Sequence, residues 1–497
     1  MNFPDLLDKG WGALMVVLFF GGSIFVHELG HFLAAKWRGL HIDRFSIGFG
    51  PKIVSWTRGS VEYRLSWFPL GGYVALPQLA DMRGIEGDSS VDYKALPRIG
   101  YLDKVIVASA GAVFNVIFAF LLASLLFFTG RPTAEDRAST EIGFLSETLV
   151  NKDGETVPAP AYSAGLRVGD QIVAIDGEPV LDWDDIQAGI ALSSGVTVSG
   201  DRVIDFEVLR GDQRLNFAVQ PIISEDYKLR QVGMLPGYTV MVKSLFPNSP
   251  AVKAGVEPGD VLVALDGNPV RSPAFYRTYI SDKKDQEVAL TVQRGDEIIE
   301  TKLVPEEVQV WKNGGTATLT GIYEFDKKRG LIYQTPVEQM VEVVTTTWTN
   351  LQALIHKNSD IGISHMSGPA GIIRVIYNAS QYDMLNTLWI VVFINVSLAI
   401  FNMMPIPVLD GGHIVFATIS KLRRNPINPN IIASIQGSFM LLLFSMIIYV
   451  SFFDISRWIS ETTEVNEIRD QRIAPVFGQD DSTTAASGET QDATPEQ

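Results

Sequence analysis

Residues 26–33 read VHELGHFL, and they place two histidines and a glutamate inside an otherwise apolar stretch. That stretch runs from Trp11 to Ala35, and a helix of about 25 residues is long enough to cross the hydrocarbon core of a bilayer. Ionisable side chains are costly at that depth, so they are rarely kept there without a function. The sequence therefore predicts a membrane helix that carries a functional site.

The composition of the whole chain supports a membrane protein. The 497 residues are 46% hydrophobic, with a mean hydropathy of +0.16. Three further apolar runs could span a bilayer, at 105–128, 388–408 and 431–453. We expect the third helix to cover 386–410 in full. The amino-terminal segment 1–35 lacks the strongly basic start of a signal peptide. Its apolar stretch is also longer than the hydrophobic region of a typical signal peptide, which predicts a retained span.

Positive charges near the spans predict the orientation of the chain. They lie between the first and second spans and between the third and fourth, at Lys36, Arg38, Arg44, Lys94, Arg98, Lys104, Lys421, Arg423 and Arg424. Both loops are then cytoplasmic. The amino terminus, the region from about 130 to 385 and the carboxyl tail would lie on the opposite, periplasmic side. The acidic, polar tail at 478–497 is expected to be disordered.

The region between spans two and three contains an internal repeat. Pro160–Val180 (PAYSAGLRVGDQIVAIDGEPV) and Pro250–Val270 (PAVKAGVEPGDVLVALDGNPV) align without a gap. Each copy resembles the central signature of PDZ domains, which predicts two PDZ-like α+β domains at 140–222 and 232–305. Such domains bind peptides by strand addition, so binding or gating is expected, with simple spacers as the alternative. The stretch 306–385 would be a connecting, amphipathic region.

The cytoplasmic segment 36–104 has the pattern of β-hairpins. Residues 45–51 (FSIGFGP) and 61–74 (VEYRLSWFPLGGYV) combine aromatic residues with glycine turns. Membrane-associated hairpins of this kind could hold an unwound substrate as an added strand, or they could only pack against the spans.

The VHELGHFL stretch has the chemistry of a metal site. His27 and His31 are four residues apart, so on a helix they share one face and can reach one metal ion. Glu28 is placed to act as general base on water that the metal activates. A catalytic zinc usually has three protein ligands. Since cysteine is absent, the third ligand should be His, Asp or Glu near another span. Asp410 is one candidate, because it lies at a depth similar to that of His31. The other candidates include the remaining histidines, His41, His356, His365 and His413.

Three motifs together resemble the site-2 protease family of intramembrane zinc metalloproteases. They are HELGH in the first span, NMMPIPVLDGGH at 402–413, and the PDZ-like insertions, and the likeness covers most of residues 10–455. The resemblance implies Zn²⁺ as cofactor, His27, His31 and Asp410 as its ligands, Glu28 as the base, and Asn402 as a residue that positions substrate. One departure is GAVFN at 111–115, where the family has proline in place of Ala112.

The expected fold class is thus a polytopic α-helical membrane protein with about four transmembrane helices. The expected function is cleavage of transmembrane segments of single-pass proteins. By resemblance, the substrates are a pre-trimmed anti-sigma factor in envelope stress signalling and remnant signal peptides. The resemblance also implies the bacterial inner membrane and a PDZ-like pair that excludes bulky proteins. The charges near the spans place the active site toward the cytoplasm. No nucleic-acid partner is expected.

Two other classes of protein remain open at this stage. A metal transporter could use the same intramembrane ligands, although it would spread them along a crossing path. A membrane-anchored PDZ adaptor could carry a vestigial metal site.

Overall fold

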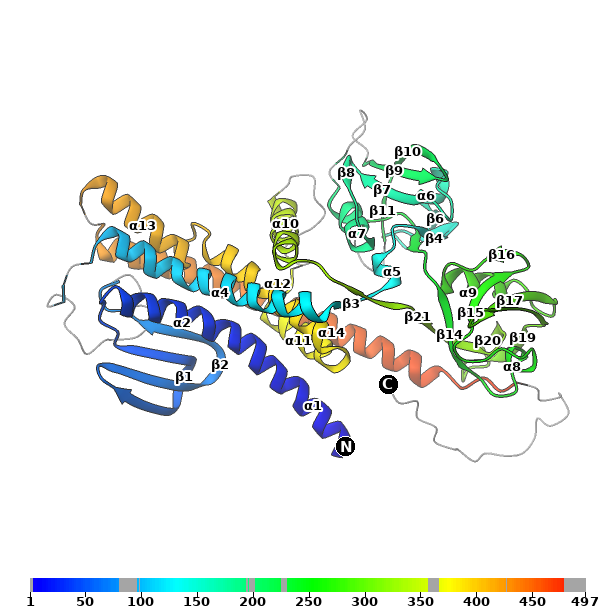
Figure 1. The fold of residues 1–497 in the computed structure, drawn as a ribbon, viewed down its shortest axis with the longest axis horizontal. Coiled ribbons are helices and arrows are strands. Elements are labelled where there is room, and N and C mark those ends of the chain that lie inside the picture. The colour runs from blue at the N-terminus through cyan, green and yellow to red at the C-terminus, as the bar shows by residue number, and fades with distance from the viewer. Residues whose placement is uncertain are drawn as a thin grey trace. The chain divides into compact units, whose positions relative to one another are not determined.

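The structure is a computed structural model, and it describes residues 3–79, 96–97, 99–193, 195, 202–224, 230–355, 366–425 and 427–477. The predicted acidic tail, Lys94, Arg98, His356 and His365 lie outside the described residues. The chain divides into two compact units, drawn in Figure 1. The first consists of Met1–Pro132 and Leu331–Ser460, and the second of Thr133–Gly330 and Glu461–Gln497.

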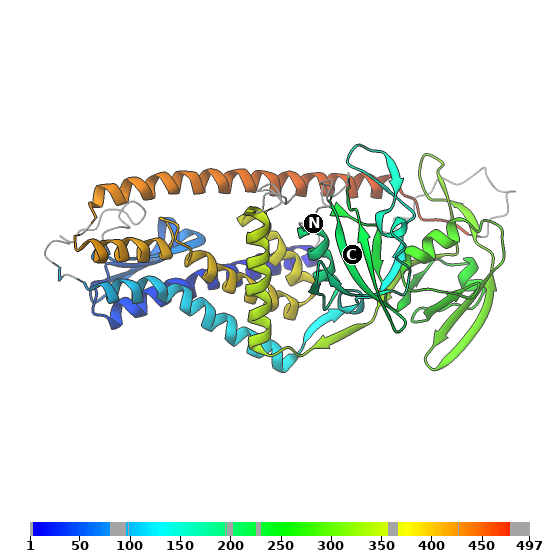
Figure 2. The same ribbon diagram turned by 90° about the horizontal axis from the view of Figure 1, so that it is seen from above.

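Four helices in the described part of the chain are long and apolar enough to cross a membrane, which fits the predicted helical membrane protein. They cover Gly10–Trp37, Tyr101–Thr129, Met384–Asn402 and Asn430–Gln471. The last belongs to α14 (Pro429–Gln471), which Figure 2 shows as one long helix. It continues well past residue 453, where the sequence predicted its end.

The first span contains a change of helix type. α1 (Phe3–Val16) passes into a π-helix, η1 (Val17–Gly21), and then into α2 (Gly22–Trp37). The Ser23 hydroxyl donates to the carbonyl of Phe19 at 2.7 Å, and the Asn395 amide donates to the Ser23 hydroxyl at 2.8 Å. A π turn inserts one extra residue and so rotates the next helical segment about the axis. The faces of α2 are therefore rotated relative to those of α1.

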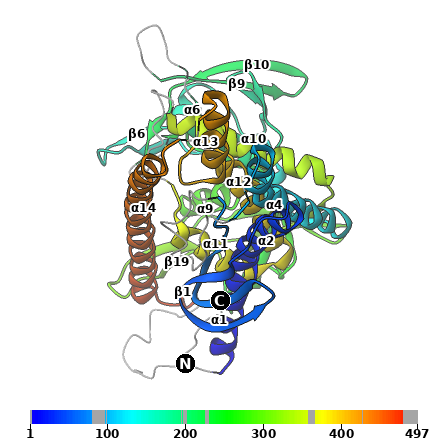
Figure 3. The ribbon, with the colours of Figure 1, turned by 90° about the vertical axis from the view of Figure 1, so that its left-hand side faces the viewer.

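The second span, α4 (Tyr101–Thr129), is the central helix of the first unit. It contacts α2, α12 (Met384–Asn402) and α13 (Asp410–Arg423), and Figure 3 shows these helices grouped together. Small residues permit the close approach. A Cβ atom at Gly30 would lie 2.5 Å from the carbonyl oxygen of Ala110. Membrane helices pack through such small residues because lipid offers no hydrophobic drive toward association.

The third span is shorter than the predicted 386–410. α12 ends at Asn402, and residues 403–409 form a turn before α13 begins at Asp410. Pro405 and Pro407 lack amide hydrogens and cannot continue a helix. Gly411 and Gly412 lie against the backbone of this turn, where any Cβ atom would collide with carbonyl oxygens. Asp410 is consequently the first residue of a new helix.

Two strands come after the first span and form a curled sheet against α2. They are β1 (Arg44–Arg58) and β2 (Val61–Ala75). Each pairs with the other twice: residues 44–47 lie between 72–75 on one side and 62–65 on the other, and 62–65 also pair with 54–57. Residues 62–65 are thus an interior strand. Among the described residues, 72–75 pair only with 44–47 and form an edge.

Two further helices occupy part of the predicted connecting region. They are α10 (Pro336–Ile355) and α11 (Pro369–Tyr382). The Gln339 amide of α10 donates to the carbonyl of Ala123 at 3.0 Å, and α11 contacts α1. Both helices therefore pack on the membrane helices of the first unit.

The second unit contains the repeat as two similar α+β domains, each with its own apolar core. The first domain comprises β4 (Ile142–Leu145), β5 (Thr148–Val150), β6 (Thr156–Pro158), α6 (Pro160–Ser163), β7 (Gln171–Ile175), β8 (Glu178–Pro179), α7 (Trp183–Leu192), β9 (Ile204–Arg210), β10 (Gln213–Val219) and β13 (Met234–Pro236). The second comprises β14 (Val240–Leu245), α8 (Pro250–Lys253), β15 (Val261–Leu265), β16 (Asn268–Pro269), α9 (Pro273–Ser281), β17 (Val288–Arg294), β18 (Glu297–Leu303), β20 (Thr316–Leu319) and β21 (Ile322–Lys327).

The limits of both domains differ from the predicted 140–222 and 232–305. β13 pairs with β4 and adds Met234 to the first core, and Val232 just before it belongs to the same core. β21 pairs with β14 and adds Ile322 to the second core. In each domain the last strand returns from beyond the repeated signature. The signature alone could not show where that closing strand lies.

The same ion pair recurs in both domains. Asp170 pairs with Arg210 and Asp260 with Arg294, each at 2.7 Å, and both carboxylates are buried. Burial alone would raise the pKa of the Asp260 carboxyl, but hydrogen bonds from the Arg294 guanidinium and the Glu257 amide hold that pKa below its ordinary value. The Gly-Asp of the repeat is therefore a structural element of each domain.

We predict that Asp260→Asn loosens the second domain alone. It leaves the Arg294 guanidinium without its buried partner, so hydrogen exchange of β15 and β17 in the full chain should accelerate roughly tenfold. Asp170→Asn is the matched control and should affect β7 and β9 instead. Because the folded-state pKa of Asp260 is lowered, wild-type protection should be present at neutral pH and lost as the pH falls through that pKa. Unchanged exchange in β17 would contradict the prediction.

Candidate active site

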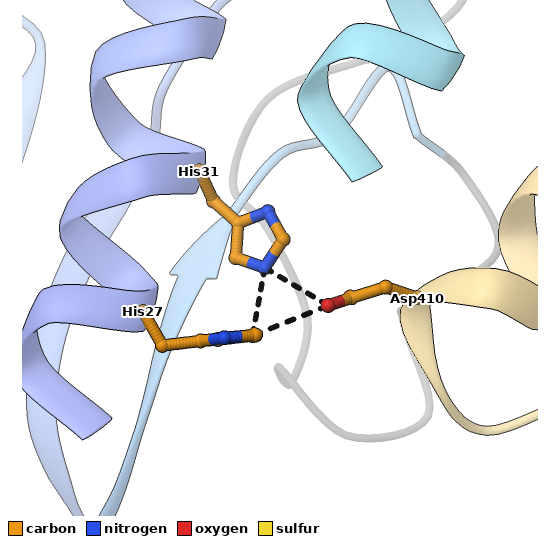
Figure 4. Close-up of side chains that lie close together, drawn as sticks. All are labelled: His27, His31 and Asp410. Carbon is orange, nitrogen blue, oxygen red and sulfur yellow. Dashed lines mark hydrogen bonds and ion pairs between the residues drawn. The ribbon is translucent and has the colours of Figure 1, made fainter. Parts of the chain in front are cut away.

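Helix α2 brings His27 and His31 together. Their Nε2 atoms lie 3.1 Å apart, and the two ring centroids are 4.7 Å apart (Figure 4). The four-residue spacing places both side chains on one face of the helix, as the sequence predicted.

Asp410 completes the cluster from the start of α13. Its Oδ2 atom lies 3.2 Å from His27 Nε2 and 3.4 Å from His31 Nε2 (Figure 4). Within the described ranges, these three residues are the group of three whose ligand atoms lie within 4.8 Å of one another. The sequence left several candidates for the third ligand, and the fold brings one of them, Asp410, to the two histidines.

The three atoms form a donor set that suits a zinc ion. Asp410 Oδ2 is buried and makes no hydrogen bond of normal geometry. Two imidazole nitrogens and one carboxylate oxygen converge, and their lone pairs repel one another unless a cation or a proton lies between them. This is the ligand set that catalytic zinc takes, with a fourth position left open.

A cavity of about 240 Å³ adjoins the cluster. Glu28 and Asn402 line it, and so do His27 and Asp410. Its remaining walls come from α2, β2, α4, α12 and the turn before α13, through Ile24, Gly71, Gly72, Asn115, Leu398, Val408 and Leu409. Five separate segments of the first unit therefore meet at one small chamber.

The β-sheet reaches this cavity by its edge. A Cβ atom at Gly72 would lie 3.0 Å from Glu28 Cγ. The hypothesis that all of 61–74 could receive a strand is wrong for 62–65, because those residues already pair on both sides. The sheet has two edges, 54–57 and 72–75, and the edge at 72–75 is the one that lines the cavity, through Gly72.

Helix α4 contributes residues whose roles the sequence did not reveal. The carbonyl of Val107 lies 2.7 Å from His31 Nδ1, and the side-chain amide of Asn115 lies 3.4 Å from His27 Nδ1. A Cβ atom at Gly111 would lie within 2.7 Å of both imidazoles. Gly111 and Asn115 stood out only as matches to a family pattern. Ala112, which replaces the family proline, is buried in the uninterrupted helix α4.

Comparison with known proteins agrees with this geometry. The model of peptidase family M50 matches residues 15–446. The chain belongs to peptidase family M50. The regulator of sigma-E protease RseP from Escherichia coli is 26% identical over 446 residues, which cover 86% of this chain and 94% of the relative. A Neisseria meningitidis relative whose name includes the words zinc metalloprotease is 28% identical, with 87% and 96% covered.

The M50 match confirms the predicted site-2 protease resemblance and the prediction of a metalloprotease. The membrane helices and the RseP-like relatives make the chain a bacterial inner membrane protein. A PDZ domain of an SdrC-like protein from Listeria monocytogenes is similar to 16% of this chain, at 26% identity and a TM-score of 0.14, with 85% of that domain covered.

We predict that Gly111→Ala disrupts the cluster. The added methyl group would overlap both imidazoles, so the affinity for zinc should fall by roughly tenfold or more. Gly22→Ala in α2 is the matched control, because a Cβ atom there meets nothing within 4 Å. Zinc retained by the purified chains during dialysis against a chelator measures the difference. Equal retention by the two variants would show that α4 does not approach the ligands this closely.

Proposed function

We propose that this M50 member is an endopeptidase that cuts the membrane segments of single-pass proteins, with zinc held by His27, His31 and Asp410. The observation that supports it most is the convergence of their three ligand atoms among membrane helices, beside a cavity that His27 and Asp410 line. When bound, zinc would supply Lewis acidity that activates water and polarises the scissile carbonyl. All three ligands lie at one place, unlike the distributed ligands that a transport path needs.

Glu28 is the proposed general base. It neighbours His27 on α2 and lines the cavity, so its carboxylate is close to the ligands without being one of them. In this role it takes the proton of the attacking water and passes it to the leaving amine. Asn402 ends α12 at the cavity wall and is proposed to hold the substrate backbone there.

The sheet edge at 72–75 is the proposed docking line for the substrate. A helical membrane segment hides its amides and carbonyls in its own hydrogen bonds and must unwind before hydrolysis. A strand edge that is paired on one side alone offers main-chain partners to the unwound segment. Gly72 brings this edge against Glu28, so an added strand would pass the proposed base.

The proposed substrates are an anti-sigma factor that another protease has already trimmed, and remnant signal peptides. The names of the RseP relatives support a role in sigma-E regulation, and the lysines and arginines near the spans support an orientation of the chain. Those charges favour an active site toward the cytoplasm, with the repeat domains in the periplasm. There the proposed PDZ-like pair would keep bulky periplasmic domains from the cavity.

We predict that Glu28→Gln lowers cleavage of a model transmembrane peptide by about 10²- to 10⁴-fold, because it removes the proton acceptor. Zinc should stay bound, since no ligand changes. His27→Ala, His31→Ala and Asp410→Ala should each lose zinc as well as cleavage. The measurement is peptide cleavage by the purified full chain, with and without a chelator. Near wild-type turnover by Glu28→Gln would refute the base assignment.

We predict that replacing the two repeat domains by a short linker widens substrate choice and preserves catalysis. None of the residues that line the cavity belongs to the second unit. The readout is cleavage of one single-pass substrate with and without its large extramembrane domain. If the shortened enzyme cut the trimmed form normally yet still rejected the full form, the domains would not be a filter.

A further inference from the structure

Asn115 is an unusual residue for the middle of a membrane helix. Its side chain is fully buried in α4, and its Oδ1 atom has no hydrogen-bond partner. Its Nδ2 atom lies 3.4 Å from Nδ1 of His27. A buried amide oxygen without a partner is costly, so this contact calls for an explanation.

The contact has consequences for the proton of His27. If Asn115 donates to Nδ1, the single proton of a neutral imidazole must lie on Nε2. The Nε2 atom faces His31 and Asp410 and could then not bind a metal. A metal-binding His27 carries its proton on Nδ1, and that proton needs an acceptor.

Rotating the Asn115 amide by half a turn supplies the acceptor. The nitrogen and oxygen of an amide occupy nearly the same positions, and the choice between them is fixed by their partners. The rotation places Oδ1 at hydrogen-bond distance from the Nδ1 hydrogen. It gives the oxygen a donor and removes a clash between two donors, and the amide nitrogen takes the position where the oxygen had no partner.

We propose that Asn115 is a positioning residue that accepts a hydrogen bond from His27 Nδ1 and thereby presents Nε2 to the zinc ion. The inference rests on the proposed function, because it requires His27 to be a ligand. The carbonyl of Val107 serves His31 Nδ1 in the same way at 2.7 Å. Val107, Gly111 and Asn115 recur every four residues, so one face of α4 orients both histidines and leaves room between them.

The test is zinc affinity of the full chain in detergent, measured by competition with a chromophoric chelator. Asn115→Leu removes the acceptor at similar volume and should weaken zinc binding by about 10- to 100-fold. Asn115→Asp keeps an acceptor and should bind zinc at least as tightly as wild type. The absorption spectrum of bound Co²⁺ should change in Asn115→Leu and be restored in Asn115→Asp.

Asn395→Leu is the matched control. Asn395 is a second fully buried asparagine of a membrane helix, with an equally orphaned Oδ1, but it bonds Ser23 and the carbonyl of Val391. Its replacement should leave zinc affinity unchanged. This separates an effect on the ligand from a general loss of helix packing.

The inference is overturned if folded Asn115→Leu binds zinc like wild type, or if Asn115→Asp binds it as weakly as a ligand variant. The second result decides the matter even where Asn115→Leu does not fold. Failure of the proposed function gives a different pattern: wild type and His27→Ala would then bind zinc equally, whatever the state of position 115.

Discussion

The meeting of His27, His31 and Asp410 is the constraint on which the rest of the first unit depends. Three polar atoms within 4.8 Å of one another are unfavourable in an apolar surrounding unless something positively charged joins them. Three separate features bring them there: the helical spacing in α2, the early end of α12, and the start of α13 at Asp410. Each feature has a local cause in the sequence, and the site exists only because the three coincide.

Close helix packing makes this coincidence possible. Gly30 and Gly111 let α2 and α4 approach so closely that a methyl group at either position would collide with its neighbour. The same approach brings the Val107 carbonyl and the Asn115 amide to the outer nitrogens of the histidines. Small residues thus serve packing and chemistry together. The polar groups that α4 aligns face the histidines, since the hydrocarbon of a bilayer offers no hydrogen-bond partner.

The sequence predicted those parts of the molecule that rest on local patterns. Helical spacing identified His27, Glu28 and His31, apolar runs identified the spans, and the repeat identified two domains. It did not predict the features that depend on tertiary pairing. Three such features depend on segments that are separated in the chain. They are the pairing of 62–65 on both sides, the strands that close each repeat domain, and the contact of Asn115 with His27. Pro405 and Pro407 indicated that α12 ends early, but the apolar run through 408 led to the prediction of a longer helix.

X-ray absorption spectroscopy at the zinc edge of the purified full chain tests the central claim most directly. The account predicts one zinc per chain in a four-coordinate site, with two imidazole nitrogens and a carboxylate oxygen at about 2.0–2.2 Å. His31→Ala should remove one imidazole contribution from any residual signal. A six-coordinate oxygen shell, or a spectrum with two imidazoles that survives Asp410→Ala and His31→Ala unchanged, would contradict it.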